Sequence, residues 1–224
     1  MSTVGAIVVA AGRSTRMGGI DKVFASLAGR PLFCHALGVF EHSPAIDQVV
    51  LVTAAEKVDA AIEAVRTFGF TKLLTICSGG ERRQDSVLAG LEQFAHLDTV
   101  VVHDAARPLV TGDLIARGLD AAAETGAAVA AVPLYDTIKE ADSDGSVVRT
   151  VDRTNLWAIQ TPQVFSFDLL LTAHRRWPAD VTDDAMLVEA VGCRVKLFLG
   201  SLRNLKVTAP DDLLIAEALL AHPS

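Results

Sequence analysis

Short apolar runs, largely β-branched or aliphatic, recur along the first 132 residues, and stretches with helical spacing separate them. The runs end at turn residues, as strands buried in a parallel sheet do. Strands that alternate with helices predict right-handed βαβ units, with helices on both faces of a mostly parallel sheet. The predicted strands are Val4 to Val9, Gln48 to Val52, Leu73 to Ile76, Thr99 to His103 and Ala127 to Val132. The helical spacings are Val58, Ile62 and Val65, then Val87, Leu91 and Phe94, then Ile115 and Leu119.

The alternation stops after Val132. Two polar strands, Thr137 to Glu140 and Val147 to Val151, flank a turn at Asp142 to Gly145, which favours a projecting β-hairpin over a crossover helix. Further helices are expected at Phe167 to Trp177, Asp184 to Val191 and about Asp211 to Leu220, with a strand at Arg194 to Leu199. Pro31 suits the first turn of a helix, and Thr208 with Asp211 suits a capping box. No linker or repeat divides the chain, so one domain covering residues 1–224 is expected.

Charge and cysteine content exclude several classes of function. The formal net charge is −7, whereas a protein that binds a nucleic acid backbone needs a basic face. The cysteines, Cys34, Cys77 and Cys193, are far apart and lack metal-ligand spacing, so they are expected to be reduced and mostly buried. The first apolar run is too short for a membrane span and has no basic residues before it. We therefore expect a cytoplasmic protein that binds neither membrane nor nucleic acid.

The segment "AAGRSTRMGG" follows the first predicted strand and is typical of a phosphate-binding loop. It is no dinucleotide fingerprint, because the third and sixth positions counted from Gly12 hold Ser14 and Met17, and this disfavours a nicotinamide dehydrogenase. It also lacks the Gly-Lys-Ser/Thr ending of a Walker A loop. Small residues let backbone N–H groups approach phosphate oxygens, and Arg16 and Lys22 add full charges, so we expect a triphosphate site. The alternative is a glycine-rich turn with solvated arginines.

Further motifs extend this pattern along nearly the whole chain: "AAGRSTRMG", "GGERRQDSV", "VHDAARP", "DTIK", "VDRTNLWAIQTPQVF", "TDDA" and "NLKVT". In this order they resemble the 2-C-methyl-D-erythritol 4-phosphate cytidylyltransferases of the non-mevalonate isoprenoid pathway. The resemblance implies a Rossmann-like nucleotidyltransferase fold, transfer of CMP from CTP to methylerythritol phosphate, and release of pyrophosphate. Cytidylyltransferases for ribitol 5-phosphate or another polyol phosphate carry similar motifs and remain the alternative. A binding module without catalysis is disfavoured, because binding alone does not need all these charges.

The resemblance also assigns roles to individual residues. Arg16, Lys22, Arg153 and Lys206 would be catalytic, Asp104 would hold Mg²⁺ or another divalent cation, and Arg107, Thr137, Thr161 and Thr182 would bind the acceptor. The nucleotide would lie against Ala10, Ala11, Gly12, Gly80, Ser86 and Ala105. The nucleophile is already an anion, so positioning and fixed positive charge suffice for catalysis and no Ser/His/Asp triad is needed. One departure concerns Lys22, which Asp21 and Val23 flank where the family usually has proline and glutamine.

Several of these residues also have a plain structural interpretation. Ser86 is expected to begin a helix, and Thr182, Asp183 and Asp184 have the residue types of a helix cap. His103, Trp157 and Trp177 are expected to serve packing, and Asp104 alternatively caps a turn. Arg82 is expected to be solvated, while for Arg83 the sequence leaves solvation and function equally open.

The predicted hairpin, from about Tyr135 to Arg153, is too polar to bury itself. An exposed two-stranded arm is unstable unless something covers it, and a second subunit is the natural cover. The resemblance implies a homodimer in which Thr137 and Arg153 reach the neighbouring chain's active site. The alternative is a mobile surface hairpin with a solvated Arg153.

Overall fold

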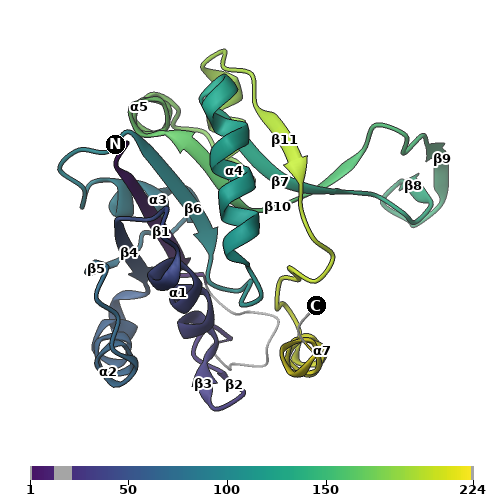
Figure 1. Ribbon diagram of the computed structural model, residues 1–224. Helices are drawn as coiled ribbons and strands as arrows, with labels where there is room; N and C mark the ends of the chain where they lie inside the picture. Colours follow the sequence, from purple (N-terminus) through teal and green to yellow (C-terminus); the bar gives the residue numbers. More distant parts are fainter. Residues whose placement is uncertain (1, 13–21, 223–224) are drawn as a thin grey trace.

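The computed structural model describes residues 2–12 and 22–222. At its centre is a seven-stranded sheet with strand order β11-β7-β10-β6-β1-β4-β5 (Figure 1). The five strands predicted before residue 133 are all present, and so is the strand predicted near residue 196. The sheet comprises β1 (Val4–Ala10), β4 (Gln48–Thr53), β5 (Leu73–Ser78), β6 (Thr99–Asp104), β7 (Ala127–Pro133), β10 (Trp157–Ser166) and β11 (Lys196–Leu199).

Strand β10 is the one central strand that the sequence pattern did not predict. It runs antiparallel to both of its neighbours, β6 and β7, whereas the other adjacent pairs in the sheet are parallel. Pro162 lies inside it, and proline cannot donate a hydrogen bond to a neighbouring strand. The register with β7 shifts between Ile159 and Gln163, so the proline occupies an irregular part of the ladder. The sheet is thus mixed, with a parallel half around β1.

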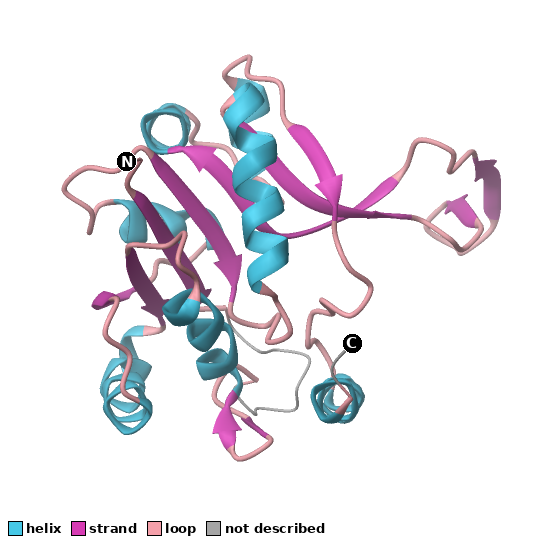
Figure 2. Ribbon diagram, in the orientation of Figure 1, coloured by secondary structure: helices cyan, strands magenta, loops and turns pink. Residues whose placement is uncertain are grey.

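Helices cover both faces of the sheet, as predicted (Figure 2). Alternate residues of β1 show the two layers, because Ala6 and Val8 join one apolar cluster while Ile7 and Val9 join the other. The first cluster includes α1 (Leu32–His42), α2 (Val58–Phe68) and α4 (Gly112–Thr125), and the second includes α3 (Arg83–Leu91), α5 (Phe167–Arg176) and α6 (Asp184–Ala190). A short 3-10 helix, η1 (Ala55–Lys57), precedes α2. The last helix, α7 (Pro210–Ala221), contacts the small hairpin of β2 (Ser26–Leu27) and β3 (Arg30–Pro31).

Helix ends correct four sequence expectations. Pro31 is the N-cap of α1 rather than a residue of its first turn. Helix α3 begins at Arg83, so Ser86 lies inside its first turn instead of beginning it, and the helix ends before Phe94. The carboxylate that caps α7 belongs to Asp212, not Asp211, because a start at Pro210 makes Asp212 the residue within reach of the backbone N–H groups of Thr208 and Ala209.

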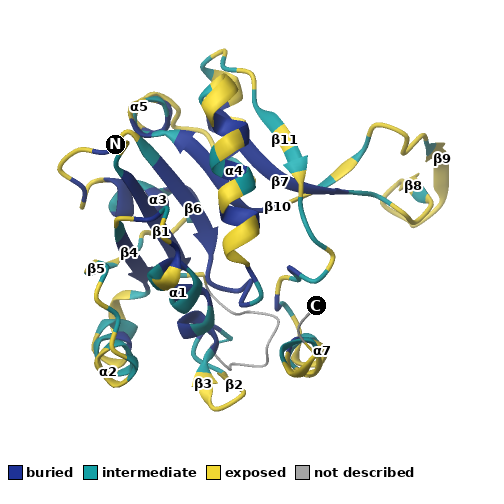
Figure 3. Cartoon of the chain, in the orientation of Figure 1, coloured by how far each residue is buried: buried dark blue, intermediate teal, exposed yellow. Residues whose placement is uncertain are grey.

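The predicted hairpin is present and projects from the rest of the fold (Figure 1). Its strands, β8 (Ile138–Ala141) and β9 (Val147–Val151), form a two-stranded sheet of their own. Nearly every residue between Tyr135 and Asn155 is exposed (Figure 3). We call residues 135–156 the arm. No helix in the described part of the chain is long and apolar enough to cross a membrane.

The strand order places an opening where β1 meets β6. Along the chain, β1 is followed in the sheet by β4 and β5 on one side, whereas β6 returns to its other side. Ligands of open α/β sheets bind beyond the carboxyl ends of the strands at such a reversal. Val9 and Asp104 are register partners in the parallel pair of β1 and β6, so these two strands end at the same edge of the sheet.

Candidate active site

A small cavity of about 200 Å³ lies at the edge where β1 and β6 end. Five of the six residues predicted to bind the nucleotide line it, namely Ala10, Ala11, Gly12, Gly80 and Ser86. The sixth, Ala105, is buried beside the cavity, and its N–H donates to the Val9 carbonyl (2.9 Å). Lys22 lines the same cavity, whereas Arg16 lies outside the described residues. The structure therefore gathers the described part of the predicted nucleotide site in one place.

Gly79 and Gly80 allow the chain beside this cavity to pack closely against the first turn of α3. A Cβ atom on Gly79 would lie 2.5 Å from both the Ala11 Cβ and the Ser86 Oγ, a distance that real structures do not tolerate. The Gly80 N–H donates to Ser86 Oγ (3.2 Å), and that hydroxyl donates in turn to the Arg82 carbonyl (3.2 Å). The "SGG" segment thus brings its backbone close to Ala11, just after the end of β1, where a side chain on Gly79 would not fit.

A larger cavity of about 670 Å³ adjoins the first. Its lining includes three of the residues predicted to bind the acceptor, Arg107, Thr161 and Thr182. Trp157, which we expected to serve packing, is 39% exposed and also lines this cavity. The Arg107 guanidinium donates to the carbonyls of Asn204 (2.7 Å) and Ile159 (3.4 Å), and burial lowers its pKa. Thr182 is exposed and does not cap α6, because the Asp183 carboxylate accepts from the Met186 N–H (3.1 Å) instead.

Three described residues line both cavities, and we call them the wall: Arg83, Asp104 and Lys206. The Asp104 carboxylate accepts from Arg83 Nε (3.1 Å) through one oxygen and from Lys206 Nζ (2.6 Å) through the other. Burial by itself would raise the pKa of Asp104, but the charges of Arg83 and Lys206 outweigh it and hold that pKa far below the usual range. The wall is therefore an ionised carboxylate between two cations at the junction of two cavities.

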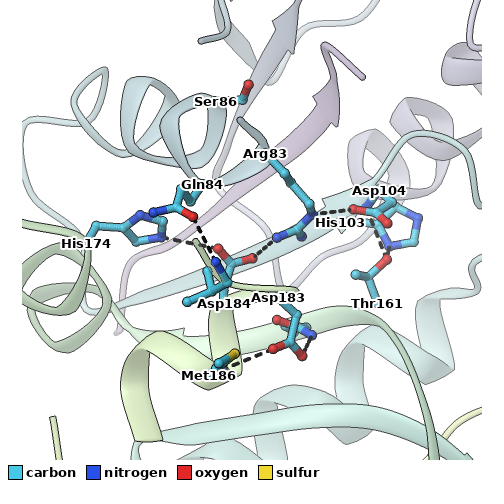
Figure 4. A network of polar contacts seen from close by, with 12 residues as sticks. Arg83, Gln84, Ser86, His103, Asp104, Thr161, His174, Asp183, Asp184 and Met186 are labelled. Atoms are coloured by element: carbon cyan, nitrogen blue, oxygen red, sulfur yellow. Dashed lines mark hydrogen bonds and ion pairs between the residues drawn. The ribbon is translucent and has the colours of Figure 1, made fainter. Parts of the chain in front are cut away.

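The second charged contact of Arg83 lies deeper. Its Nη1 donates to the Asp184 carboxylate (2.6 Å), and the other oxygen of Asp184 contacts His174 Nε2 (3.2 Å). Figure 4 shows Arg83 stretched between Asp104 on one side and Asp184 on the other. Sequence reasoning left Arg83 undecided and considered Asp184 only as a helix cap. Their charges were visible in the sequence, but nothing there indicated that residues 101 positions apart would pair.

The comparisons with known proteins point to one family over nearly the whole chain. The model of the 2-C-methyl-D-erythritol 4-phosphate cytidylyltransferase family matches residues 4–222. The chain belongs to this family. A relative of that name from Dehalococcoides mccartyi is 50% identical over 217 residues, which cover 97% of this chain and 96% of the relative. The crystal structure of the enzyme from Thermus thermophilus is 34% identical with a TM-score of 0.80, and the match covers 99% of this chain and 100% of that one. The 4-diphosphocytidyl-2C-methyl-D-erythritol synthase of Anaerococcus prevotii is 26% identical, with a TM-score of 0.86 and coverage of 99% and 97%.

The chain is thus an enzyme, a cytidylyltransferase that transfers CMP from CTP to 2-C-methyl-D-erythritol 4-phosphate and releases pyrophosphate, in isoprenoid biosynthesis. The family resemblance seen in the sequence is confirmed, and so is the Rossmann-like fold that it implied. A nicotinamide dehydrogenase and a binding module are both excluded.

Two motifs of the cytidylyltransferase, "VHDAARP" and "TPQ", are joined by a buried chain of hydrogen bonds. The Asp104 N–H donates to Thr161 Oγ1 (3.0 Å), whose hydroxyl donates to His103 Nδ1 (3.1 Å). Because the Arg107 carbonyl only accepts, His103 Nε2 carries the proton in its 3.0 Å contact with that oxygen. Burial lowers the pKa of His103 to about 4, which keeps the ring neutral. His103 is therefore a structural residue, as expected, and the Thr161 hydroxyl is engaged in positioning Asp104.

Lys206 reaches the wall because the segment after β11 is fixed on both sides. The Asn204 amide donates to the Thr161 carbonyl (2.8 Å), and the Val207 N–H donates to the Ala106 carbonyl (2.8 Å). These bonds hold Lys206 against the end of β6.

Thr137 and Arg153, in contrast, lie exposed on the arm, and neither lines either cavity. Within one chain the structure does not bring them to the wall.

Proposed function

We propose that the wall is where the two substrates react, with CTP in the smaller cavity and methylerythritol phosphate in the larger one. The observation that carries this proposal is that Arg83, Asp104 and Lys206 line both cavities. A phosphate oxygen of the acceptor forms a bond to the α-phosphorus of CTP. The bond from that phosphorus to the oxygen bridging to the β-phosphate breaks, and pyrophosphate leaves with the electron pair.

Fixed positive charge is the main contribution that these residues make. Both substrates are anions, and more charge collects on the phosphoryl oxygens in the transition state. Lys22 and Lys206, which both line the smaller cavity, would supply cations, and Arg16 is proposed from the sequence alone. The backbone at Ala10, Ala11, Gly12, Gly80 and Ala105, together with Ser86, would hold the nucleotide and read cytosine through hydrogen bonds that a wrong base leaves unmade. Arg107, Thr161 and Thr182 would bind or position the acceptor.

A divalent cation fits the wall when the nucleotide supplies most of its ligands. Among the described residues, no three His, Cys, Asp or Glu side chains gather as a metal site. Asp104 is the carboxylate common to the two cavities, and it stays ionised. Mg²⁺ commonly takes one or two carboxylates and completes its shell with substrate phosphates and water. Asp104 would therefore hold Mg²⁺ together with the triphosphate, and the bound ion would offset charge on the phosphate oxygens.

The arm is proposed to complete the site of a partner subunit in a homodimer. Within the part of the chain that the structure describes, its two strands pair only with each other, and Val147 and Val148 are each 59% exposed. A two-stranded hairpin of this kind is marginal in water by itself. Thr137 and Arg153 would then act on the substrates of the neighbouring chain. The three cysteines are free, which supports the further proposal that the enzyme works in the cytoplasm.

Turnover measured as pyrophosphate release, with phosphorus NMR of the product, tests the proposed site. Lys22→Ala is expected to lower kcat at least about a hundredfold while CTP binding weakens modestly, because the charge is assigned to the transition state. Lys196→Ala is the matched control, since this lysine pairs with Glu124 on the surface and lines neither cavity. Near-normal kcat in Lys22→Ala would refute the assignment. Turnover with ribitol 5-phosphate that equals turnover with methylerythritol phosphate would refute the acceptor.

Hybrid dimers test the shared site. Arg153→Ala and Lys22→Ala chains are each expected to be inactive alone, and a mixture is expected to regain activity because one of the two sites in a hybrid holds both native residues. Arg149→Ala in place of Arg153→Ala is the control, since Arg149 pairs with Glu140 inside the arm. If subunit exchange is demonstrated and no activity returns, the arm does not complete the partner's site.

A further inference from the structure

Arg83 and its neighbour Arg82 are each held between two aspartates, one pair inside the protein and the other at its surface. Arg82 bonds Asp85 (2.6 Å) and Asp180 (2.9 Å), and the Asp180 side chain is 85% exposed. Arg83 bonds Asp104 and Asp184, and the Asp184 side chain is 0% exposed. The two arginines have the same chemistry in opposite surroundings, so only the inner one can gain much from its second carboxylate.

Both carboxylate oxygens of Asp184 make a polar contact, one with Arg83 and the other with His174. One carboxylate oxygen accepts from Arg83 Nη1 (2.6 Å), and the other contacts His174 Nε2 (3.2 Å). Burial would raise the pKa of Asp184, but Arg83 and His174 outweigh it and keep the pKa below its ordinary value. A buried carboxylate kept ionised in this way is a fixed anchor for a guanidinium.

The segment that carries Asp184 is itself tied to the first turn of α3. The Gln84 side chain donates to the Ala179 carbonyl (3.0 Å) and accepts from the Val181 N–H (3.1 Å). Arg82 Nη1 donates to the Pro178 carbonyl (3.0 Å). Asp184 therefore has a set position relative to the backbone of Arg83, and Figure 4 shows Gln84, Arg83 and Asp184 side by side.

We propose that Asp184 is a positioning residue for the cytidylyltransferase reaction. It holds Arg83 in contact with Asp104 at the wall, and His174 contacts the other oxygen of Asp184 and keeps that carboxylate in place. The inference rests on the proposed placement of the reaction at the wall. A guanidinium is a rigid planar fork, so contacts on two of its edges fix both its position and its rotation. With Asp104 as its only partner, Arg83 would rotate about that contact. Its Nη2 is buried and has no partner among the described residues, so the orientation of Arg83 also sets where this donor is presented.

The first test compares Asp184→Asn with Asp180→Asn. Each variant neutralises one aspartate that pairs with an arginine: Asp184 pairs with Arg83, and Asp180 pairs with Arg82. Asp184→Asn is expected to lower kcat about tenfold while KM for CTP changes less than about threefold, because a loosened Arg83 affects the reacting geometry more than nucleotide binding. Asp180→Asn is expected to keep the kcat of the unmodified enzyme. Equal kcat in the unmodified enzyme and a folded Asp184→Asn would overturn the proposal.

A double-mutant cycle separates positioning from general loss of structure. Arg83→Lys keeps the charge at the wall but loses the fork. If Asp184 acts through Arg83, adding Asp184→Asn to Arg83→Lys is expected to lower kcat by less than about twofold, whereas independent effects would multiply. A full further tenfold loss in the double variant would overturn the proposal.

His174→Phe covers the case in which Asp184→Asn does not fold. It removes one contact of Asp184 and keeps the carboxylate and its pair with Arg83. The expected effect is a fall in kcat of about threefold that disappears in the Arg83→Lys background. An unchanged kcat, or a fall of the same size in both backgrounds, would contradict the role of His174.

Lys206→Ala, assayed alongside, tests the wall itself. Normal turnover in Lys206→Ala would refute the proposed function. A large loss there, combined with independent effects of Asp184→Asn and Arg83→Lys in the double-mutant cycle, would refute only the positioning role of Asp184.

Discussion

The wall and the arm contain the same kinds of charged side chain, and they differ in how much water surrounds them. In the wall, the Asp104 side chain is 11% exposed and pairs with Arg83 and Lys206. In the arm, Arg149 pairs with Glu140, and their side chains are 66% and 49% exposed. A pair in water is worth little, whereas a buried one is costly to break because the remaining charge is left without a partner. Burial, more than the number of ion pairs, therefore decides where a change of charge has consequences.

The two regions also differ in what holds their backbones. The strand ends beside the wall belong to a sheet packed by helices on both faces, and the chain from Asn204 to Val207 is bonded to them. Among the described residues, the strands of the arm pair only with each other, and Figure 3 shows that the arm is largely exposed. The geometry of the wall is thus set within one chain, and we expect the geometry of the arm to depend on a partner subunit.

The largest expected effect comes from neutralising the same charge in each region. Asp104→Asn leaves Arg83 and Lys206 facing each other without a carboxylate between them, so kcat is expected to fall more than about a hundredfold. Glu140→Gln in the arm is expected to change kcat less than about twofold. Pyrophosphate release measures both. Comparable losses in the two variants would remove the distinction between the regions.

A second effect concerns stability in mild acid. Burial lowers the pKa of His103 to about 4, below the ordinary value of about 6.5. The unfolded chain therefore binds the proton more readily, and the free energy of unfolding is expected to fall as the pH drops from about 6.5 towards about 4. The expected loss from His103 between pH 7 and pH 5 is about 2 kcal/mol. The lowered carboxyl pKa values of Asp104 and Asp184 act in another window, below about pH 4, where protonation removes their stabilising charge.

Urea unfolding at pH 7 and pH 5 isolates the histidine. His103→Asn is expected to have a smaller difference between the two pH values than the unmodified enzyme, whatever its stability at pH 7. His96→Asn is the control, because His96 is exposed. An unchanged pH difference in His103→Asn would show that the ring does not titrate as its burial requires.

Sequence patterns predicted most of the parallel half of the fold, and also that most of the residues lining the smaller cavity lie together, because both depend on local features. An apolar strand followed by small residues identifies the loop after β1, and the carboxyl ends of parallel strands meet at one edge, which brings Lys22, Gly80 and Asp104 together. Strand β10 was missed because Pro162 argues against a central strand, and its irregular register could not be seen in the sequence.

The sequence also could not show which charged residues, far apart along the chain, form ion pairs with each other. In "GGERRQDSV" the two arginines look equivalent, and their difference depends on where α3 begins. With Arg83 as the first helical residue, Arg82 turns to solvent and Arg83 turns inward to Asp104 and Asp184. The same uncertainty of about one residue in a helix start explains why Asp211 was predicted to cap α7 in place of Asp212.

The smallest expected effect is also the one that most sharpens the contrast between wall and arm. Arg149→Ala removes an exposed ion pair, and in an isolated arm it is expected to lower the free energy of unfolding by less than about 1 kcal/mol. Chemical denaturation at several protein concentrations measures this change. If the arm lies against a partner subunit as proposed, part of the Arg149 side chain becomes buried there, and the cost of Arg149→Ala is expected to grow with protein concentration as dimers form. A cost that stays small at every concentration would mean that this part of the arm remains in water even in the dimer, so its partner contacts must come from elsewhere, with the exposed Val147 and Val148 as the first candidates.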